Sequence, residues 1–184
     1  MSTHTFLSYE QLKRLVAGHK KQQKKIILTQ GTFDMLHIGH GRYLAKAKSY
    51  GDVLIVGVDN DAKVKARKGP DRPIVPEDER LEMLTYLKAV DHVVRKPNTA
   101  ERWELIRLVQ PDVLISTKKT YTSEELVELE VYCKKVVVLE PMATTSTSAK
   151  LRLVQVGAAK KIEKTLSTKL VKAIEDVLFE LKTE

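Results

Sequence analysis

Two histidines three residues apart, His37 and His40, are the side chains of this sequence best placed to do chemistry. They end the stretch Thr29-Gln-Gly-Thr-Phe-Asp-Met-Leu-His-Ile-Gly-His40, where an apolar segment stops and a helical pattern begins. On one helical turn both imidazoles face the same side. Gly31 lets the backbone approach a phosphate closely, and Gly39 keeps the helix start open to an anion. Imidazole N–H groups beside such a cradle can neutralise charge building on phosphorus, which indicates phosphoryl or nucleotidyl transfer.

The histidine pair has two other interpretations, a zinc site and a purely structural pair. Zinc would need further His, Cys or carboxylate ligands. The remaining histidines are scattered, Cys133 is isolated, and Asp34 is the one candidate carboxylate nearby. No serine or cysteine has the surroundings of a covalent nucleophile, so the chemistry rests on positioning and charge stabilisation.

Composition restricts the class of protein. The 184 residues allow one domain with one core. No apolar run approaches the roughly 20 residues that span a bilayer, and the N-terminus is too short and polar for a signal peptide. The single cysteine excludes an intramolecular disulfide. These features predict a cytoplasmic protein without a membrane partner.

The charge balance favours polyanionic partners such as nucleotides or phosphorylated metabolites. Lys and Arg number 32 against 24 Asp and Glu, a net charge of +8. Basic residues gather at 20–25, 63–68 and 160–164, although each run also fits a solvated surface.

Five short apolar segments alternate with helical patterns along most of the chain. We expect strands at 26–28, 53–58, 92–94, 112–115 and 136–139, helices at 8–19, 39–50, 76–88, 99–109 and 123–133, and a long loop at 60–76. This alternation predicts an α/β fold, a Rossmann-like doubly wound parallel five-stranded sheet with helices on both faces. The histidine pair then follows the first strand, at the carboxyl edge where open α/β sheets bind ligands.

The end of the chain has a different pattern. Ile162, Leu166, Leu170 and Ile174 fall every four residues, which predicts an amphipathic helix. We expect one domain over 1–157 and a C-terminal helical extension over 158–184. The apolar stripe must pack on its own domain or on a second copy of the chain, and the sequence leaves both open.

The stretch from Gly31 to His40 resembles the G-T-F-D-x-x-H-x-G-H signature of the cytidylyltransferase-like nucleotidyltransferases. Further similarity lies in Leu54-Ile-Val-Gly-Val-Asp-Asn-Asp61, in the segment from Arg72 to Leu84 and in Ser146-Thr-Ser148, so that the resemblance covers roughly residues 24–155. It implies condensation of a nucleoside triphosphate with a phosphorylated small molecule and release of pyrophosphate.

The resemblance also implies roles for the matching residues. His37 and His40 would stabilise the transition state, and Arg80 would hold the β- and γ-phosphates. A magnesium ion would share the charge, although the sequence identifies no ligands for it. The residues implied in binding the triphosphate are Gly31, Thr32, Phe33, Asp34, Gly39, Asp61, Lys65, Lys68, Ser146, Thr147 and Ser148.

Several of these residues fit other roles equally well. Arg80 has glutamates nearby and could form a surface ion pair, whereas Lys65 and Lys68 could be solvated loop charges. Asp61 could cap a loop. The segment 146–148 could cap a helix, which is compatible with a phosphate contact.

Within this family, residues 59–73 most resemble the adenylyltransferase domain of bifunctional heptose-phosphate enzymes. Archaeal FAD synthetases share much of that run, and glycerol-phosphate cytidylyltransferases share the first motif. Residues 116–121 depart from all three, because Ser-Thr-Lys-Lys-Thr-Tyr replaces the K-G-G-D-Y of heptose enzymes. Pro141-Met-Ala143 stands where cytidylyltransferases often carry a basic residue, which favours ATP over CTP.

We therefore expect transfer of a nucleoside monophosphate from ATP to a phosphorylated sugar or polyol, most like a heptose-1-phosphate adenylyltransferase. Glycerol-3-phosphate cytidylyl transfer and FMN adenylylation are the enzymatic alternatives. A binding module for nucleotides or RNA that has lost turnover is the other, and the net charge and the Lys118-Lys119 pair favour it. The intact histidine pair favours the enzyme, so nucleic acid is not the expected partner, whereas a homodimer is a candidate assembly.

Overall fold

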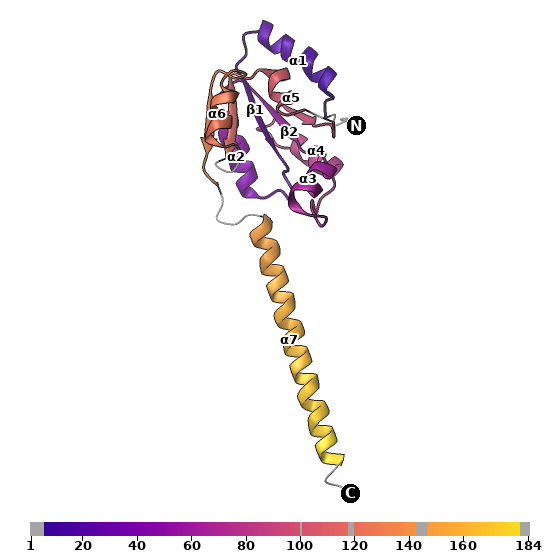
Figure 1. The fold of residues 1–184 in the computed structure, drawn as a ribbon. Helices are drawn as coiled ribbons and strands as arrows, with labels where there is room; N and C mark the ends of the chain where they lie inside the picture. Colours follow the sequence, from indigo (N-terminus) through magenta and orange to yellow (C-terminus); the bar gives the residue numbers. More distant parts are fainter. Residues whose placement is uncertain (1–5, 100, 118–119, 143–146, 181–184) are drawn as a thin grey trace. The chain divides into compact units, whose positions relative to one another are not determined.

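The structure, a computed structural model, describes residues 6–99, 101–117, 120–142 and 147–180. The chain divides into two compact units, Met1–Thr144 and Thr145–Glu184. The first unit holds the strands β1 (Ile26–Gly31), β2 (Val53–Val58), β3 (His92–Arg95), β4 (Val113–Thr117) and β5 (Val136–Leu139) and the helices α1 (Tyr9–Lys21), α2 (Ile38–Lys48), α3 (Asp61–Lys68), α4 (Glu77–Thr85), α5 (Glu104–Val109) and α6 (Ser123–Leu129). The second unit is one long helix, α7 (Thr147–Glu180), drawn in orange to yellow in Figure 1.

The five strands form one sheet in the order β3-β2-β1-β4-β5. Every pairing is parallel, so the expected α/β fold is confirmed. After β1 the chain adds β2 and β3 on one side and then β4 and β5 on the other. The order therefore reverses between β1 and β4, which makes their carboxyl ends the switch point of the sheet, where ligands bind in this architecture.

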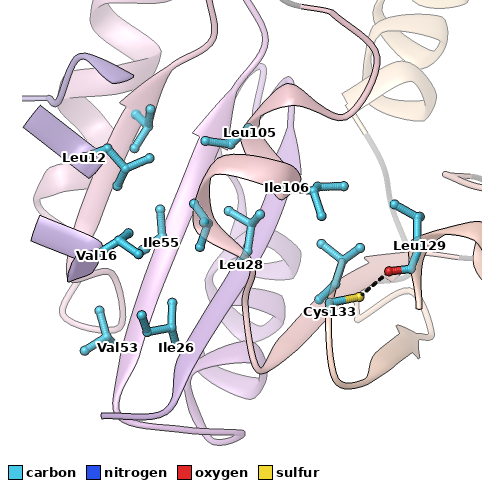
Figure 2. Close-up of a cluster of buried hydrophobic side chains, with 13 residues drawn as sticks. Leu12, Val16, Ile26, Leu28, Val53, Ile55, Leu105, Ile106, Leu129 and Cys133 are labelled. Carbon is cyan, nitrogen blue, oxygen red and sulfur yellow. Dashed lines mark hydrogen bonds between the residues drawn. The ribbon is translucent and has the colours of Figure 1, made fainter. Parts of the chain in front are cut away.

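Two apolar layers cover the two faces of the sheet. On one face, α1, α5 and α6 form a cluster with Ile26 and Leu28 of β1 and with residues of β2. Figure 2 shows Leu12 and Val16 of α1 near Ile55 of β2 in this cluster. On the other face, α2 and α4 contribute Leu44 and Leu81 to a second cluster. Because side chains alternate along a strand, residues of even number in β1 and β4 face the α1–α5–α6 layer.

Local signals explain where several helices begin. Ser8 precedes α1 and accepts a hydrogen bond from the Gln11 backbone N–H (3.3 Å), while Gln11 Oε1 accepts one from the Ser8 N–H (2.9 Å). This capping box is the one that the sequence predicts. It fixes the start of the helix that packs across β3 and α5.

The expected loop over residues 60–76 is wrong in its first half, where α3 forms. Asn60 caps this helix by accepting a hydrogen bond from the Lys63 N–H (2.8 Å), and Val64 is its one buried residue. A helix with so few apolar residues has almost no hydrophobic periodicity, so the sequence does not reveal it. Helix α5 is also shorter than expected, beginning at Glu104 rather than near residue 99.

Helix α7 begins at Thr147, so the division expected after residue 157 falls inside it. Its apolar stripe is exposed: Ile162, Leu166, Leu170 and Ile174 keep between 51% and 64% of their surface accessible. Among the described residues, no helix is both long enough and apolar enough to cross a membrane.

Candidate active site

The two histidines lie side by side where β1 leads into α2. Their ring centroids are 4.1 Å apart, and the ring planes are inclined by 33°. His37 is the N-cap of α2 and His40 is its third residue, so the helix start itself sets their spacing. Both rings are partly exposed at the carboxyl edge of the sheet.

A reciprocal pair of hydrogen bonds fixes which nitrogen of each ring carries the hydrogen. His37 Nδ1 accepts from the Gly39 N–H (3.1 Å), and His40 Nδ1 accepts from the His37 N–H (3.4 Å). A ring nitrogen that accepts has a free lone pair, so the hydrogen of the neutral ring sits on Nε2. The cap therefore places the N–H of each ring on Nε2, on the side away from the helix backbone.

His40 is held in its neutral form at pH 7. Burial is the largest cause that lowers its pKa, to about 4, and the electrostatic effects of His37 and Lys68 lower it further, against an opposing effect of Asp34. The Phe33 ring contributes to this burial, because it lies edge-on to His40 with centroids 5.7 Å apart. His40 therefore serves as a hydrogen-bond donor rather than as an acid.

The bend between β1 and α2 is tightly built. Phe33 and Met35 both adopt a left-handed backbone, with φ of 51° and 50°. A side chain at Gly31 would approach the Phe33 ring to 3.1 Å, so glycine here gives room to this ring. The main role of Gly31 is therefore to leave space for the Phe33 ring, and that ring in turn packs against His40.

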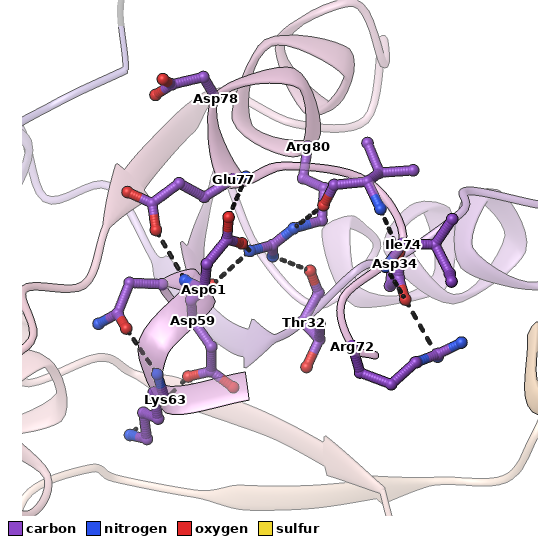
Figure 3. A network of polar contacts seen from close by, with 12 residues as sticks. Thr32, Asp34, Asp59, Asp61, Lys63, Arg72, Ile74, Glu77, Asp78 and Arg80 are labelled. Atoms are coloured by element: carbon purple, nitrogen blue, oxygen red, sulfur yellow. Dashed lines mark hydrogen bonds and ion pairs between the residues drawn. The ribbon is translucent and has the colours of Figure 1, made fainter. Parts of the chain in front are cut away.

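Asp34 fastens the segment that follows α3 onto this bend. The buried carboxylate accepts hydrogen bonds from the Ile74 N–H (3.1 Å) and the Val75 N–H (3.0 Å) and pairs with Arg72 at 3.0 Å (Figure 3). Asp34 is only 4% exposed, so these contacts lie inside the protein. Asp34 thereby positions Arg72 beside the bend.

Arg80 lies at the centre of the same network and is 1% exposed. Its Nε donates to the Val75 carbonyl (2.9 Å), Nη1 donates to the Thr32 carbonyl, and Nη2 donates to the Asp59 carbonyl (2.9 Å) and the Asp61 carboxylate (2.8 Å). Figure 3 shows its guanidinium between these groups. The geometry favours a positioning role, since Arg80 ties the ends of β1 and β2 together, rather than direct contact with a triphosphate.

Asp61 joins the starts of two helices. Its backbone N–H donates to Glu77 Oε2 (2.7 Å), and its own carboxylate accepts from the Glu77 N–H (3.3 Å). Together with the contact to Arg80, this pairing occupies the Asp61 side chain at the α3–α4 junction. Its expected contact with the nucleotide stays a prediction.

A cationic cluster that the sequence did not identify surrounds Asp59. This buried carboxylate pairs with Lys96 (2.8 Å), Arg67 (3.1 Å) and Lys63 (3.8 Å). Burial alone would raise the pKa of Asp59, but the three cations, Lys96 first, outweigh it and lower that pKa. Three positive charges around one negative charge leave a net positive site beside the bend.

Arg67 connects this cluster to the histidine segment. Its guanidinium donates to Thr32 Oγ1 (2.8 Å) as well as to Asp59, although half of its side chain stays exposed. In the sequence, Arg67 is part of the basic run of 63–68, but from that run only Lys65 and Lys68 are expected to bind the triphosphate. Helical spacing on α3 would have grouped Lys63 with Arg67, four residues apart.

The other predicted residues divide into two groups. Both lysines are exposed residues of α3, but Lys68 acts electrostatically on His40, which places it at the site, whereas Lys65 is not among the groups that shift the pKa of His40. Gly39 is buried at the start of α2, where its N–H donates to His37. Ser146 lies outside the described residues, as do the side chains of Thr147 and Ser148.

The fit of a magnesium ion depends on its ligands. In the part of the chain that the structure describes, no three His, Cys, Asp or Glu side chains converge as a metal site. Asp34 and Asp59 both face cations instead. Magnesium is often held mostly by substrate phosphates and water, so this donor set fits an ion that arrives on a triphosphate and does not form a protein cage.

Comparisons with known proteins identify the family and the fold of this chain. The cytidylyltransferase-like family model matches residues 28–174. The bifunctional protein HldE of a Nitratiruptor species is 42% identical over 141 residues, 77% of this chain and 30% of the relative. HldE of Helicobacter pylori (strain G27) is 41% identical over 138 residues, 75% of this chain and 29% of the relative. The chain thus spans about a third of the length of these curated relatives.

Solved structures show the same fold. A lipopolysaccharide core biosynthesis protein from Thermoplasma volcanium superposes with a TM-score of 0.57 at 27% identity, covering 65% of this chain and 99% of that protein. Pantoate-beta-alanine ligase from Francisella tularensis shares the fold alone, with a TM-score of 0.53 at 18% identity, over 73% of this chain and 67% of its own. With the family match over most of its length and the histidine bend in place, this chain belongs to the cytidylyltransferase-like nucleotidyltransferase family.

Proposed function

We propose that this chain is an adenylyltransferase that transfers AMP from ATP to a heptose 1-phosphate and releases pyrophosphate. The observation that carries the proposal is the pair of Nε2–H donors that the α2 cap presents at the sheet edge. The HldE relatives and the lipopolysaccharide core biosynthesis protein support the choice of a heptose acceptor. The sequence over 59–73 and Pro141-Met-Ala143 support ATP over CTP.

The chemistry needs no covalent intermediate with the protein. An oxygen of the acceptor phosphate attacks the α-phosphorus of ATP, a new P–O bond forms, and the bond to the β-phosphate oxygen breaks. Pyrophosphate leaves with that electron pair. The two Nε2–H groups donate to the α-phosphate oxygens while negative charge is concentrated there, and no proton has to move.

Cations beside the bend would bind the departing pyrophosphate. Lys68 acts on His40, Arg67 donates to Thr32 and Arg72 pairs with Asp34, so all three belong to the same end of the sheet. Magnesium would arrive with ATP and neutralise part of the phosphate charge. We expect the enzyme in the cytoplasm, where ATP and sugar phosphates are available.

The test is pyrophosphate release from purified protein with magnesium and each of ATP and CTP, against heptose 1-phosphate, glycerol 3-phosphate and FMN. We expect release with ATP and heptose 1-phosphate, and loss of release in His40→Ala. Release only with CTP and glycerol 3-phosphate, or with ATP and FMN, would replace the proposed substrates. No release with any pair, together with salt-sensitive RNA binding unaffected by His40→Ala, would favour a silent binding module.

We also propose that a second copy of this chain covers the apolar stripe of α7. Four large aliphatic residues that are more than half exposed support it. The charge pattern supports an antiparallel pair, since Lys160 and Lys161 precede the stripe, Lys164 lies near its start, and the acidic residues of 175–180 follow it. Light scattering should report a dimer, and Leu166→Lys should convert it to a monomer, whereas an unchanged mass would exclude this interface.

A further inference from the structure

Ser116 carries a buried hydroxyl that the fold leaves without a partner. The residue is 3% exposed, and its Oγ makes no hydrogen bond within the described part of the chain. Such groups are rare in native proteins, because an unsatisfied buried hydroxyl destabilises the fold. One explanation for such a hydroxyl is a ligand that supplies the missing hydrogen bond.

The position of Ser116 points to a ligand. It lies next to the last residue of β4, and Thr29 of β1 pairs with Ile115 of β4, so Gln30 is its neighbour across the switch point. Both side chains face the α1–α5–α6 layer, since residues 28 and 114 do. Substrates of open α/β sheets bind outside the carboxyl ends of the strands at this point.

Tyr121 bonds to Gln30, the cross-strand neighbour of Ser116. Gln30 Nε2 donates to the Tyr121 hydroxyl oxygen (3.1 Å), and the Tyr121 ring packs against the same apolar layer. Since that oxygen accepts a bond, its own O–H remains to donate. Burial raises the pKa of Tyr121 to about 12, so this donor is present at pH 7.

The chemistry of this trio differs from that of the phosphate side of the site. The cations Arg67, Lys68 and Arg72 gather at the bend and α3, whereas Ser116, Gln30 and Tyr121 carry no charge. Hydroxyl and amide groups of this kind match a group that both donates and accepts. A neutral hydroxyl both donates and accepts, whereas an ionised phosphate only accepts and finds charged, stronger partners at the bend.

We infer that Ser116, with Gln30 and Tyr121, binds a hydroxyl group of a substrate sugar ring. This inference rests on the proposed function, which supplies two such rings: the acceptor sugar and the ribose of ATP. The sugar hydroxyl would bond to Ser116 Oγ and accept from the Tyr121 O–H. The trio would then determine which sugar is accepted without taking part in the chemical step.

The test measures binding of each substrate separately by calorimetry, with ATP or heptose 1-phosphate as the probe. We expect Ser116→Ala to weaken one of the two by about five- to tenfold, the value of one neutral hydrogen bond. An analogue of that substrate that lacks the contacted hydroxyl should bind wild type and Ser116→Ala equally. The arms are 2′-deoxy-ATP, 3′-deoxy-ATP and monodeoxy heptose 1-phosphates, so they tell the two rings apart.

Two further variants make the result specific. Tyr121→Phe should weaken the same substrate, and Ser49→Ala, which removes an exposed hydroxyl at the far end of α2, should change neither affinity. The melting temperature of Ser116→Ala should stay the same or rise, because no protein hydrogen bond is lost. Unchanged affinities in both Ser116→Ala and Tyr121→Phe would overturn the inference.

The outcome separates this inference from the proposed function. If wild type releases pyrophosphate and the two variants bind both substrates normally, the inference fails alone. If wild type shows no turnover but Ser116→Ala still weakens a sugar-bearing ligand, the proposed reaction fails and the sugar site stands.

Discussion

His40 Nδ1 accepts a hydrogen bond from the backbone N–H of His37, so the catalytic candidate that ends the motif also caps the helix begun by its partner. The pair therefore has a structural and a chemical role at once. The zinc and purely structural interpretations of these histidines differ from the catalytic one in what a single substitution does to turnover.

The first prediction concerns this pair. His40→Ala should lower kcat about 100- to 1000-fold, the range found when one donor to developing charge is removed, and should change the KM for ATP much less. Steady-state pyrophosphate release checks it. His19→Gln is the matched control. His19 lies in the last turn of α1 and bonds to His92, the first residue of β3, at the amino edge of the sheet and therefore opposite the candidate site. Equal losses in the two variants would contradict a catalytic role.

The second prediction concerns pH and stability. The pKa of His40 is lowered to about 4 from an ordinary 6.5, so between these values the unfolded chain binds a proton that the folded protein does not. The free energy of unfolding should therefore fall as the pH drops from 6.5 toward 4 and be fully restored above 6.5. His40 alone contributes about 2 kcal/mol of this change by pH 4.5.

Urea unfolding of wild type and His40→Gln at pH 7.5 and 4.5 isolates the contribution of His40. His19 and His92 also have lowered pKa values, mainly through burial, and they contribute equally in both proteins. The variant should lose less stability on acidification than wild type does. An identical loss would show that the His40 ring titrates normally.

The third prediction compares two arginines. Arg80→Ala should lower the free energy of unfolding by about 3–5 kcal/mol, since it leaves buried carbonyls and Asp61 without their partner. Arg14→Ala should change it by less than about 1 kcal/mol, because its ion pair with Glu10 is almost fully exposed. If Arg80→Ala keeps its stability and loses only affinity for ATP, Arg80 is a phosphate ligand after all.

The sequence predicts those features of the fold that depend on neighbours along the chain. Continuous runs such as Val53–Val58 identify buried strands, and the Ser8 capping box identifies the start of α1. The spacing of His37 and His40 predicts that both rings lie on the same side of the helix start. Each of these signals lies within one turn or one strand.

Features that depend on contacts across the chain could not be predicted in this way. Arg80 has a polar sequence environment, yet it is buried because Thr32, Asp59 and Asp61 converge on it from other elements. Lys96 meets Asp59 only because β3 and β2 are neighbours. Helix α3 itself depends on such contacts, since Arg67 anchors it to Thr32 and Asp59.

The fourth prediction tests the packing beside the site with two glycines. A Cβ at Gly57 would come within 2.4 Å of Leu105 Cδ2, so Gly57→Ala should lower the free energy of unfolding by about 1–3 kcal/mol as the leucine is displaced. Gly18 lies inside α1 with nothing within 4 Å, so Gly18→Ala should raise it by about 0.5–1 kcal/mol. Opposite signs in urea unfolding check the prediction, and a stabilised Gly57→Ala would contradict the close packing of α5 on β2.

The fifth prediction separates two lysines of α3 that the sequence treats alike. Lys68 acts on His40, and burial and the neighbouring Arg67 and Arg72 lower its own pKa, so it sits in a crowded cationic site that an anion would relieve. Lys68→Ala should therefore raise the KM for ATP about tenfold or more, the value of one hydrogen bond to a charged group. Lys65→Ala should change the KM much less, because Lys65 lies nearly one turn earlier on α3 and is not among the groups that shift the pKa of His40.

Measuring the KM of both variants at low and high salt distinguishes a direct contact with ATP from general electrostatic attraction, since salt screening strongly reduces only the attraction. Equal effects that vanish at high salt would mean that α3 attracts ATP without binding its phosphates.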